Sequence, residues 1–266
     1  MAISQSGETI DTLSALKEAQ NKGLDTVAIT NTIMSSIARQ VDEGIYQRVG
    51  PEVSVASTKA FTSQMVLLLM LAVLIGRKND MSLLDSKKII KYLRRLPNLI
   101  DQTLSMTQET VRKLAVQHSL LNEMTFLGRQ YMYPIALEAA LKTRELSYIN
   151  TIGYPSGEMK HGPLASISLS SFLWVLAPQE EIREKNITTM KELKSRRVNH
   201  LTLIKQEGQD FPEDCYDNVI NIPDAPDFLL PILTAIPIQL FSLYMAQVRK
   251  LNVDKPRNLA KSVTVE

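Results

Sequence analysis

The stretch MTFLGRQYMYPIALEAALKTRELSYI, residues 124–149, places a short apolar run directly before a longer segment with helical spacing. Met124 to Leu127 is typical of a buried strand, and the pattern from Tyr133 to Ile149 predicts an amphipathic helix. The same alternation recurs on both sides, with further strands predicted at 2–4, 26–30, 172–176, 200–204 and 219–222 and further helices at 9–22, 57–77, 86–96, 105–116, 178–196 and 225–248. Short strands that alternate with longer helices indicate the α/β class, with parallel sheets and crossover helices.

The length of 266 residues exceeds that of a typical single domain and predicts two. Residues 79–119 are helical in pattern and free of predicted strands, so we expect them to connect two sheet-centred units. The first unit supplies only two clear strands and starts within an element at Ser4, so we expect it to be incomplete. The expected division is a partial first unit, a helical connector, a second unit and an irregular C-terminal tail, at residues 1–82, 83–118, 119–250 and 251–266.

The charge is nearly balanced, with 30 Lys+Arg against 28 Asp+Glu, and the basic residues are spread among acidic ones. This distribution argues against a nucleic-acid partner. The densest basic patch runs from Lys87 to Arg95 on a predicted helix and is typical of a solvated helix face.

The single cysteine, Cys215, excludes an internal disulfide. His118, His161 and His200 lie too far apart in sequence for a recognisable zinc motif, so we expect no structural metal. The longest apolar run, residues 65–75, is shorter than the roughly 20 residues that a membrane-spanning helix needs. The N-terminus lacks the basic and apolar regions of a signal peptide, and we therefore expect a cytoplasmic protein without a membrane partner.

A hydroxyl-rich turn, Ser4-Gln5-Ser6-Gly7-Glu8-Thr9, follows the first predicted strand and precedes an amphipathic helix. Hydroxyls and free backbone N–H groups at a helix N-terminus suit a phosphate dianion, and the helix dipole adds a favourable field. The alternative is an ordinary Ser or Thr N-cap with Glu8 in the first turn. A second small-residue turn at Ser57-Thr58 precedes a long apolar helix. Ser57 could cap this helix. Alternatively, Ser57 or Thr58 could donate a hydrogen bond to a sugar or phosphate ligand.

Glu138, Lys142 and Glu145 lie at positions i, i+4 and i+7 of the predicted helix over 133–149, so they share one face. The strongly apolar flanks favour an enclosed face, where Lys142 would keep Glu145 ionised while desolvation raised its basicity. Opposing influences of this kind tune a general base. An ordinary ion pair within the helix is the alternative.

His161 follows Ser156-Gly157-Glu158-Met159-Lys160 and precedes Gly162-Pro163, so it lies in a predicted loop where a histidine could pass protons near neutral pH. His118 and His200 lack such a setting and are expected to be surface or strand-end residues. The tail from Val253 mixes apolar residues with Asn258 and Lys261, and it could be a free tail or fold over a cleft and deliver an amine.

Five segments together resemble signatures of the glutamine:fructose-6-phosphate amidotransferase family, in the family's order. They are SQSGET at 4–9, VASTKAF at 55–61, YPIALE at 133–138, EMKHGPL at 158–164 and PRNLAKSVTVE at 256–266. The resemblance implies the isomerase part of such an enzyme, with two sugar isomerase (SIS) subdomains, each a doubly wound parallel sheet. It also implies a homodimer that shares its active sites, fructose-6-phosphate and glucosamine-6-phosphate as ligands, and no cofactor.

The resemblance also implies a role for each matched residue. The phosphate is held by Ser4, Gln5, Ser6 and Thr9, and the sugar is lined by Val55 and Ser57. Glu145 matches the base that moves a proton between C1 and C2, and Lys142 is its charged partner. His161 matches a ring-opening histidine offered by the neighbouring subunit, and Lys261 a tail lysine that engages the open-chain carbonyl.

The chain departs from the family pattern at Lys142-Thr143-Arg144-Glu145-Leu146 and at Ser54, where a glycine is common, and we expect both to be tolerated. The family's glutaminase domain and an earlier Gly-Thr-Ser sugar loop have no counterpart in these 266 residues. We therefore expect a truncated chain, with weak or absent synthesis by itself and a glutaminase domain in the full-length parent.

Two alternatives fit part of the pattern. Another enzyme with this fold, such as a phosphosugar isomerase or a fructosamine-phosphate deglycase, would share the phosphate turn and the helix glutamate but need not end in this tail. A phosphosugar-binding module would keep the fold without catalysis, and the joint presence of Glu145, His161 and Lys261 argues against it.

Overall fold

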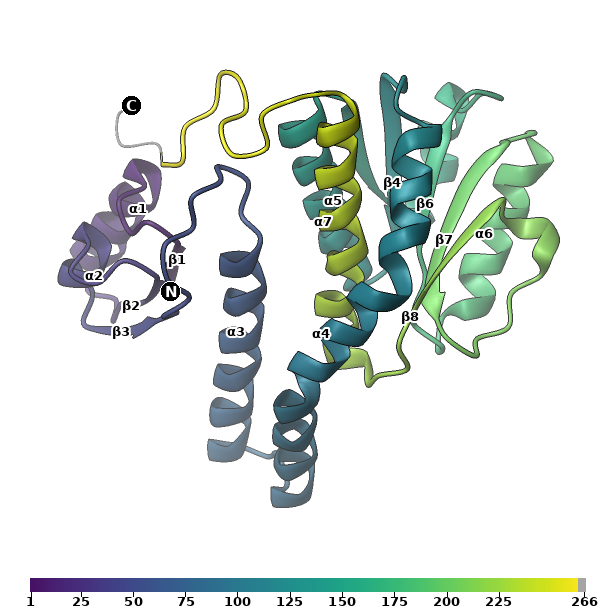
Figure 1. The fold of residues 1–266 in the computed structure, drawn as a ribbon. Helices are drawn as coiled ribbons and strands as arrows, with labels where there is room; N and C mark the ends of the chain where they lie inside the picture. Colours follow the sequence, from purple (N-terminus) through teal and green to yellow (C-terminus); the bar gives the residue numbers. More distant parts are fainter. Residues whose placement is uncertain (263–266) are drawn as a thin grey trace. The chain divides into compact units, whose positions relative to one another are not determined.

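A computed structural model describes residues 1–262 of the chain and shows an α/β protein (Figure 1). The chain divides into two compact units. One consists of Met1–Ile90 together with the C-terminal segment that begins at Asp254, and the other is Lys91–Val253. The first unit is therefore discontinuous in sequence, and the second is inserted into it. The last four residues of the predicted tail, 263–266, lie outside the described residues.

The first unit is built on a three-stranded parallel sheet with strand order β1-β2-β3. Its elements are β1 Ala2–Ser4, α1 Ile10–Asn21, β2 Val27–Thr30, α2 Ser36–Gln40, β3 Glu43–Tyr46 and α3 Lys59–Lys78. Leu16 of α1, Ala28 of β2 and Ile37 of α2 form a small buried core. Both short helices thus pack on the sheet and fix the turn between β1 and α1.

The second unit is built on a five-stranded parallel sheet with strand order β5-β4-β6-β7-β8. Its strands are β4 Glu123–Gly128, β5 Asn150–Pro155, β6 Phe172–Leu176, β7 His200–Gln206 and β8 Asn218–Ile222. Its main helices are α5 Met132–Ser147, α6 Arg183–Ser195 and α7 Leu230–Val248. The connection from β4 through α5 leads to β5 on one side, while β6 lies on the other side of β4, which is the order of a doubly wound sheet.

Strand β6 shows why the sheet is covered on both faces, since all five of its residues are buried. Phe172 and Trp174 point to one face, where both rings contact Phe241 of α7. Leu173 and Val175 point to the other and belong to a core cluster that includes Met190 of α6. The continuous apolar run is what a central parallel strand requires.

The long helix α4, Leu83–Gln117, replaces the two separate helices predicted over 86–96 and 105–116. The prediction ended the first of them before Pro97, but the helix continues through this proline. Proline removes one hydrogen bond of a helix without always ending it. The prediction of two helices is therefore wrong, although the prediction of a strand-free helical segment is confirmed.

Two strands and one short helix were not predicted, namely β3, β5 and α2. Strand β3 has the sequence EGIY and β5 has NTIGYP, and neither shows an uninterrupted apolar run. The predicted loop after β5 forms the 3₁₀ helices Ser156–His161 and Pro163–Ser166. His118 was expected to be a surface or strand-end residue. It follows the end of α4 and is only 7% exposed, with its ring 4.2 Å from that of Phe172.

Two helical segments are long and apolar enough to cross a membrane, Lys59–Lys78 and Asp227–Val248, and both have a mean hydropathy of 1.8. The second is mostly buried within the protein, whereas only 11% of the first is buried. Core helices pass the same test of length and composition, so this test does not identify a membrane span.

Candidate functional site

The predicted phosphate turn forms a closed loop at the carboxyl end of β1. The Ser4 hydroxyl accepts a hydrogen bond from the Gly7 N–H at 3.0 Å and lies 3.0 Å from the Thr9 hydroxyl. The Ser6 hydroxyl accepts from the Glu8 N–H at 3.2 Å. Thr9 is the N-cap of α1 but makes no side-chain cap bond, so an ordinary Ser or Thr cap does not explain the turn.

The turn is tied to α2 by both backbone and side-chain bonds. The Gly7 carbonyl accepts from the Ile37 N–H at 2.9 Å, and the Glu8 carboxylate accepts from the N–H and hydroxyl of Ser36 at 2.7 and 2.6 Å. These bonds from Ser36 lower the pKa of Glu8. Gln5 contributes its carbonyl, which accepts from the Asn31 N–H at 3.0 Å. The turn is therefore held in one shape by bonds to neighbouring elements.

The start of α3 is capped by Glu52. The prediction that Ser57 caps this helix is therefore wrong. The Glu52 carboxylate accepts from the Thr58 and Ala60 N–H groups at 2.9 and 3.2 Å. Ser57 and Val55 are half-buried in the loop before the helix, and the Val55 N–H donates to the Asp254 carbonyl at 3.1 Å.

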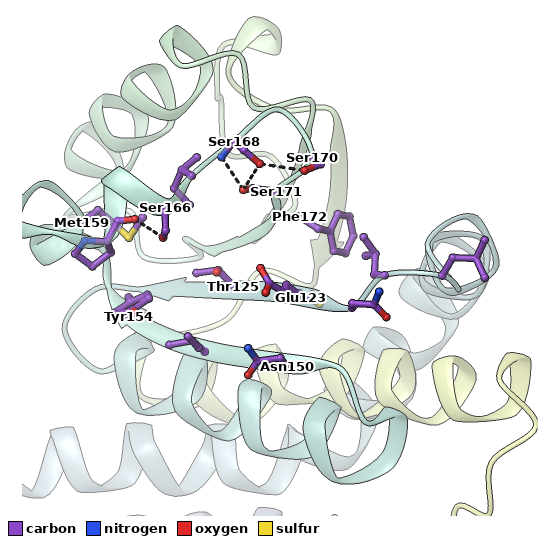
Figure 2. Close-up of a pocket in the computed structure, with 17 residues that line it drawn as sticks. Glu123, Thr125, Asn150, Tyr154, Met159, Ser166, Ser168, Ser170, Ser171 and Phe172 are labelled. Carbon is purple, nitrogen blue, oxygen red and sulfur yellow. Dashed lines mark hydrogen bonds between the residues drawn. The ribbon is translucent and has the colours of Figure 1, made fainter.

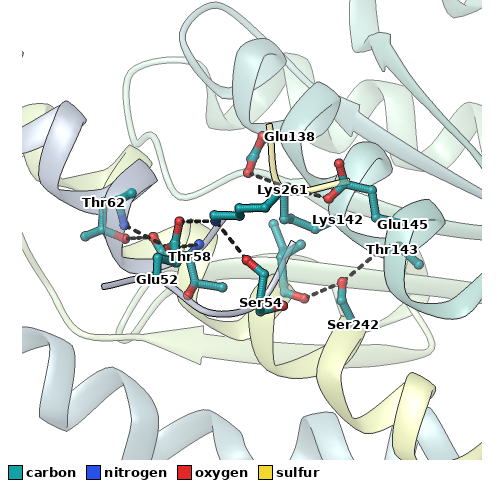
Figure 3. Close-up of polar contacts among 12 residues, drawn as sticks. Glu52, Ser54, Thr58, Thr62, Glu138, Lys142, Thr143, Glu145, Ser242 and Lys261 are labelled. Carbon is teal, nitrogen blue, oxygen red and sulfur yellow. Dashed lines mark hydrogen bonds and ion pairs between the residues drawn. The ribbon is translucent and has the colours of Figure 1, made fainter. Parts of the chain in front are cut away.

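Lys261 lies against the same loop (Figure 3). Its ammonium group donates to the other Glu52 carboxylate oxygen at 2.7 Å and to the Ser54 carbonyl at 2.8 Å. The tail residue is thus docked on the first unit, next to the turn that carries Val55 and Ser57.

The three charged residues of α5 form a largely buried cluster in the second unit (Figure 3). The Lys142 ammonium lies 2.6 Å from a Glu145 carboxylate oxygen and 3.8 Å from a Glu138 oxygen. The side chains are only 5%, 18% and 16% exposed in the order Lys142, Glu145 and Glu138. An ordinary solvated ion pair is therefore excluded, and the enclosed face that the apolar flanks predicted is present.

Glu138 is the residue of this cluster whose pKa is shifted toward neutral pH. Burial raises the pKa of Glu138 to about 7, with Glu145 adding to the rise and Lys142 opposing it. A carboxyl with such a pKa can hold or release a proton at neutral pH. Sequence reasoning placed Glu138 on the correct face but gave it no role.

His161 lies at the end of the 3₁₀ helix over Ser156–His161 and is exposed. Its ring makes no hydrogen bond within the described residues 1–262. The adjacent Lys160 forms an ion pair with Glu192 at 2.6 Å. His161 is therefore an exposed side chain in the described part of the chain.

A pocket of about 450 Å³ lies in the second unit, and none of the predicted site residues within the described residues 1–262 lines it (Figure 2). Glu123 and Thr125 of β4 and Tyr154 of β5 form one wall, and the serine-rich segment 166–171 forms another. No Lys, Arg or His lines it, so it offers no cation to a phosphate.

The described part of the chain, residues 1–262, holds no group of three or more His, Cys, Asp or Glu residues that could bind a metal ion. The donors at the phosphate turn and near Lys261 are hydroxyls, backbone N–H groups and one ammonium. These groups suit an oxygen-rich anionic ligand.

Glu52 is the residue of this region that the sequence did not single out. It lies six and eight residues before the N–H groups that it caps and 209 residues before Lys261. The sequence signal that could have identified Glu52 was an acidic residue close to the start of a helix. Many helices have such a residue, so this signal is not specific. The contact to the tail could not be inferred from spacing.

A doubly wound parallel sheet, a hydroxyl turn at a helix start and a buried carboxylate–lysine cluster define the class of the protein. The family model of the SIS domain matches residues 1–74 and 121–249, and the chain belongs to this family. The chain is 42% identical over its whole length to the glutamine–fructose-6-phosphate aminotransferase (isomerizing) of Caldanaerobacter subterraneus subsp. tengcongensis and 41% identical to that of Aquifex aeolicus. The resemblance that the five motifs indicated is therefore confirmed.

A solved structure gives the same result at the level of the fold. The C-terminal domain of glucosamine-fructose-6-phosphate aminotransferase from Francisella tularensis matches with a TM-score of 0.89 and 33% identity, over 96% of this chain and 72% of that chain. The chain spans only 44% and 43% of the lengths of the two relatives. It thus corresponds to a part of those proteins.

Proposed function

We propose that the chain is the sugar-phosphate isomerase part of an enzyme that makes glucosamine-6-phosphate from fructose-6-phosphate and glutamine-derived ammonia. The observation that carries the proposal is the buried Glu138–Lys142–Glu145 cluster in a chain 42% identical over its full length to an enzyme named for this reaction. The glutaminase domain elsewhere in the protein, the homodimer and the cytoplasmic location belong to the same proposal.

Each residue has a role in the proposed reaction. Ser4, Gln5, Ser6 and Thr9 bind the phosphate, and Val55 and Ser57 line the sugar. Ammonia condenses with the C2 carbonyl of the open-chain ketose and water leaves. Glu145 then takes a proton from C1 while the imine nitrogen gains one, which gives an enolamine. A proton returned to C2, with loss of the O1 hydroxyl proton, yields the 2-amino aldose.

The remaining charged residues support this proton transfer. Lys142, 2.6 Å from Glu145, keeps that carboxylate oriented. His161, contributed by a neighbouring subunit, opens the sugar ring, and Lys261 engages the open-chain carbonyl. None of these steps calls for a metal or an organic cofactor.

The test is a product assay with fructose-6-phosphate and ammonium, using the protein in its natural length. Replacing Glu145 by Gln removes the base but keeps the side-chain volume. We expect glucosamine-6-phosphate formation to fall by about 10²–10⁴-fold, the usual contribution of a positioned general base. Glu109→Gln, which breaks an exposed ion pair with Lys113, is the matched control and should keep wild-type activity. Unchanged product formation in the Glu145 variant would reject the assignment.

A further inference from the structure

Glu52 makes contacts that its position in the sequence does not suggest. Its side chain is 4% exposed, although it precedes the exposed start of α3. One carboxylate oxygen accepts the Thr58 and Ala60 N–H groups, and the other accepts the Lys261 ammonium at 2.7 Å. A single carboxylate therefore joins the N-terminus of α3 to the C-terminal segment.

A buried carboxylate persists only when donors compensate for its lost hydration. Burial alone would raise the pKa of Glu52, but the bonds from Lys261, Thr58 and Ala60 outweigh it and hold the pKa below its ordinary value. Glu52 is therefore ionised at neutral pH, and its charge is shared between a helix start and an amine.

The contacts of Glu52 lie on both sides of the Val55–Ser57 turn in the sequence. This turn lies between Glu52 and the helix that Glu52 caps, and the Val55 N–H is bonded to the Asp254 carbonyl of the tail. The tail is thus attached twice to one short segment, through Asp254 and through Lys261. Loss of the Glu52 charge would remove the ionic contact of Lys261 and leave its bond to the Ser54 carbonyl and the contact through Asp254.

We propose that Glu52 is a positioning residue that fixes Lys261 beside the Val55–Ser57 turn, so that the tail amine is presented to the sugar bound there. This inference rests on the proposed function for the identity of the ligand. The link between Glu52 and the tail can be measured without any sugar.

The experiment compares backbone hydrogen exchange in residues 254–262 of the wild type, Glu52→Gln, Lys261→Met and the double variant. The Glu52→Gln side chain would keep an oxygen for the Thr58 and Ala60 N–H groups but lose the charge that holds Lys261. We expect tail exchange to become roughly tenfold faster in either single variant, as expected for loss of a charged hydrogen bond, and no faster in the double variant. Glu18→Gln, which breaks the exposed pair with Lys22, is the control and should leave the tail unchanged.

The proposal would be overturned if tail amides exchanged at the wild-type rate in Glu52→Gln. It would also be overturned if the increase in exchange rate in the double variant were the product of the two single increases. Lys261→Met leaves the cap of α3 intact, so it tests the tail attachment even if the Glu52 variant were to fold poorly.

In the natural-length protein, Glu52→Gln should lower kcat about tenfold with little change in KM for fructose-6-phosphate, because the phosphate turn is untouched. A rise in KM with unchanged kcat would contradict a role through Lys261. If the wild type makes no glucosamine-6-phosphate, the proposed function is rejected. The exchange measurement would still decide whether Glu52 fixes Lys261.

Discussion

Glu138 and Glu145 share one lysine, but the lysine is not shared equally. The Lys142 ammonium lies 2.6 Å from Glu145 and 3.8 Å from Glu138. Its charge therefore acts more strongly on Glu145, and burial dominates at Glu138. The spacing of the three residues predicted their common face. The distances from Lys142 to the two carboxylates differ because of side-chain packing. Sequence spacing alone does not predict such packing.

Glu138→Gln should flatten the pH dependence of stability. The unfolded chain releases this proton near pH 4.5 and the folded protein near 7, so its contribution to stability is full below about 4.5 and is lost as the pH rises through about 7. The loss amounts to as much as about 3 kcal/mol. Urea unfolding of wild type and variant at pH 4.5 and 8 measures it, with Glu109→Gln as the exposed control. An identical pH slope in Glu138→Gln would show that another group titrates.

His118 gives the opposite dependence. Burial, with His200 adding repulsion, lowers the pKa of His118 to about 4. A histidine with a depressed pKa stabilises the fold fully above about 6.5 and less as the pH falls toward 4. His118→Gln should therefore remove up to about 3 kcal/mol of acid destabilisation in that range, seen as a smaller drop in Tm between pH 7 and 4.5. His161→Gln, at an exposed site, should reproduce the wild-type drop. Retention of the full wild-type drop in the His118 variant would refute this origin.

At the scale of elements, a glycine explains why β5, one of the two strands that were not predicted, has a weak strand signal. A Cβ at Gly153 of β5 would lie 2.7 Å from the Ala136 carbonyl oxygen of α5, and one at Gly128 of β4 would overlap the Met132 backbone. Both glycines let α5 pack closely on its two strands. Gly153 therefore allows close packing of the helix but lowers the strand propensity of β5. Because of this low propensity, the sequence pattern did not predict β5.

Gly7→Ala tests the phosphate turn as an element. Gly7 has φ +68°, and an added Cβ would overlap the Ser35 side chain. Gly23→Ala is a matched control, because Gly23 has φ +71° with no atom within 4 Å of the added carbon. The control should cost about 1 kcal/mol for the backbone alone, and Gly7→Ala at least about 1 kcal/mol more. Unfolding in urea gives both values. Gly7→Ala should also weaken fructose-6-phosphate binding in a calorimetric titration, and equal effects of the two substitutions would exclude the clash.

For the whole molecule, the alternation of apolar runs and helices was sufficient to predict the α/β class and the strands β4, β6, β7 and β8. The apolar runs of these strands are the signal that sequence reasoning used. The edge strand β5 and the strand β3 carry glycine and polar residues, and only pairing with a neighbour identifies them. The predicted domain limits at 82, 118 and 250 remain predictions.

The site was predicted as a set of local motifs, and the roles given to their residues remain predictions. What sequence reasoning lacked were the partners across long separations, such as Glu8 with Ser36 and Glu52 with Lys261. Local periodicity reports which face a residue occupies. It does not report which distant residue meets it there.

The interrupted first unit has a consequence for biosynthesis. Residues 91–253 emerge from the ribosome between its two parts, so the inserted unit can reach its native state while Glu52 is still without its amine. Lys261 is translated only after every strand of both sheets. A message cut short just before its codon would thus encode every strand of both sheets but leave the Glu52 carboxylate without its counter-charge.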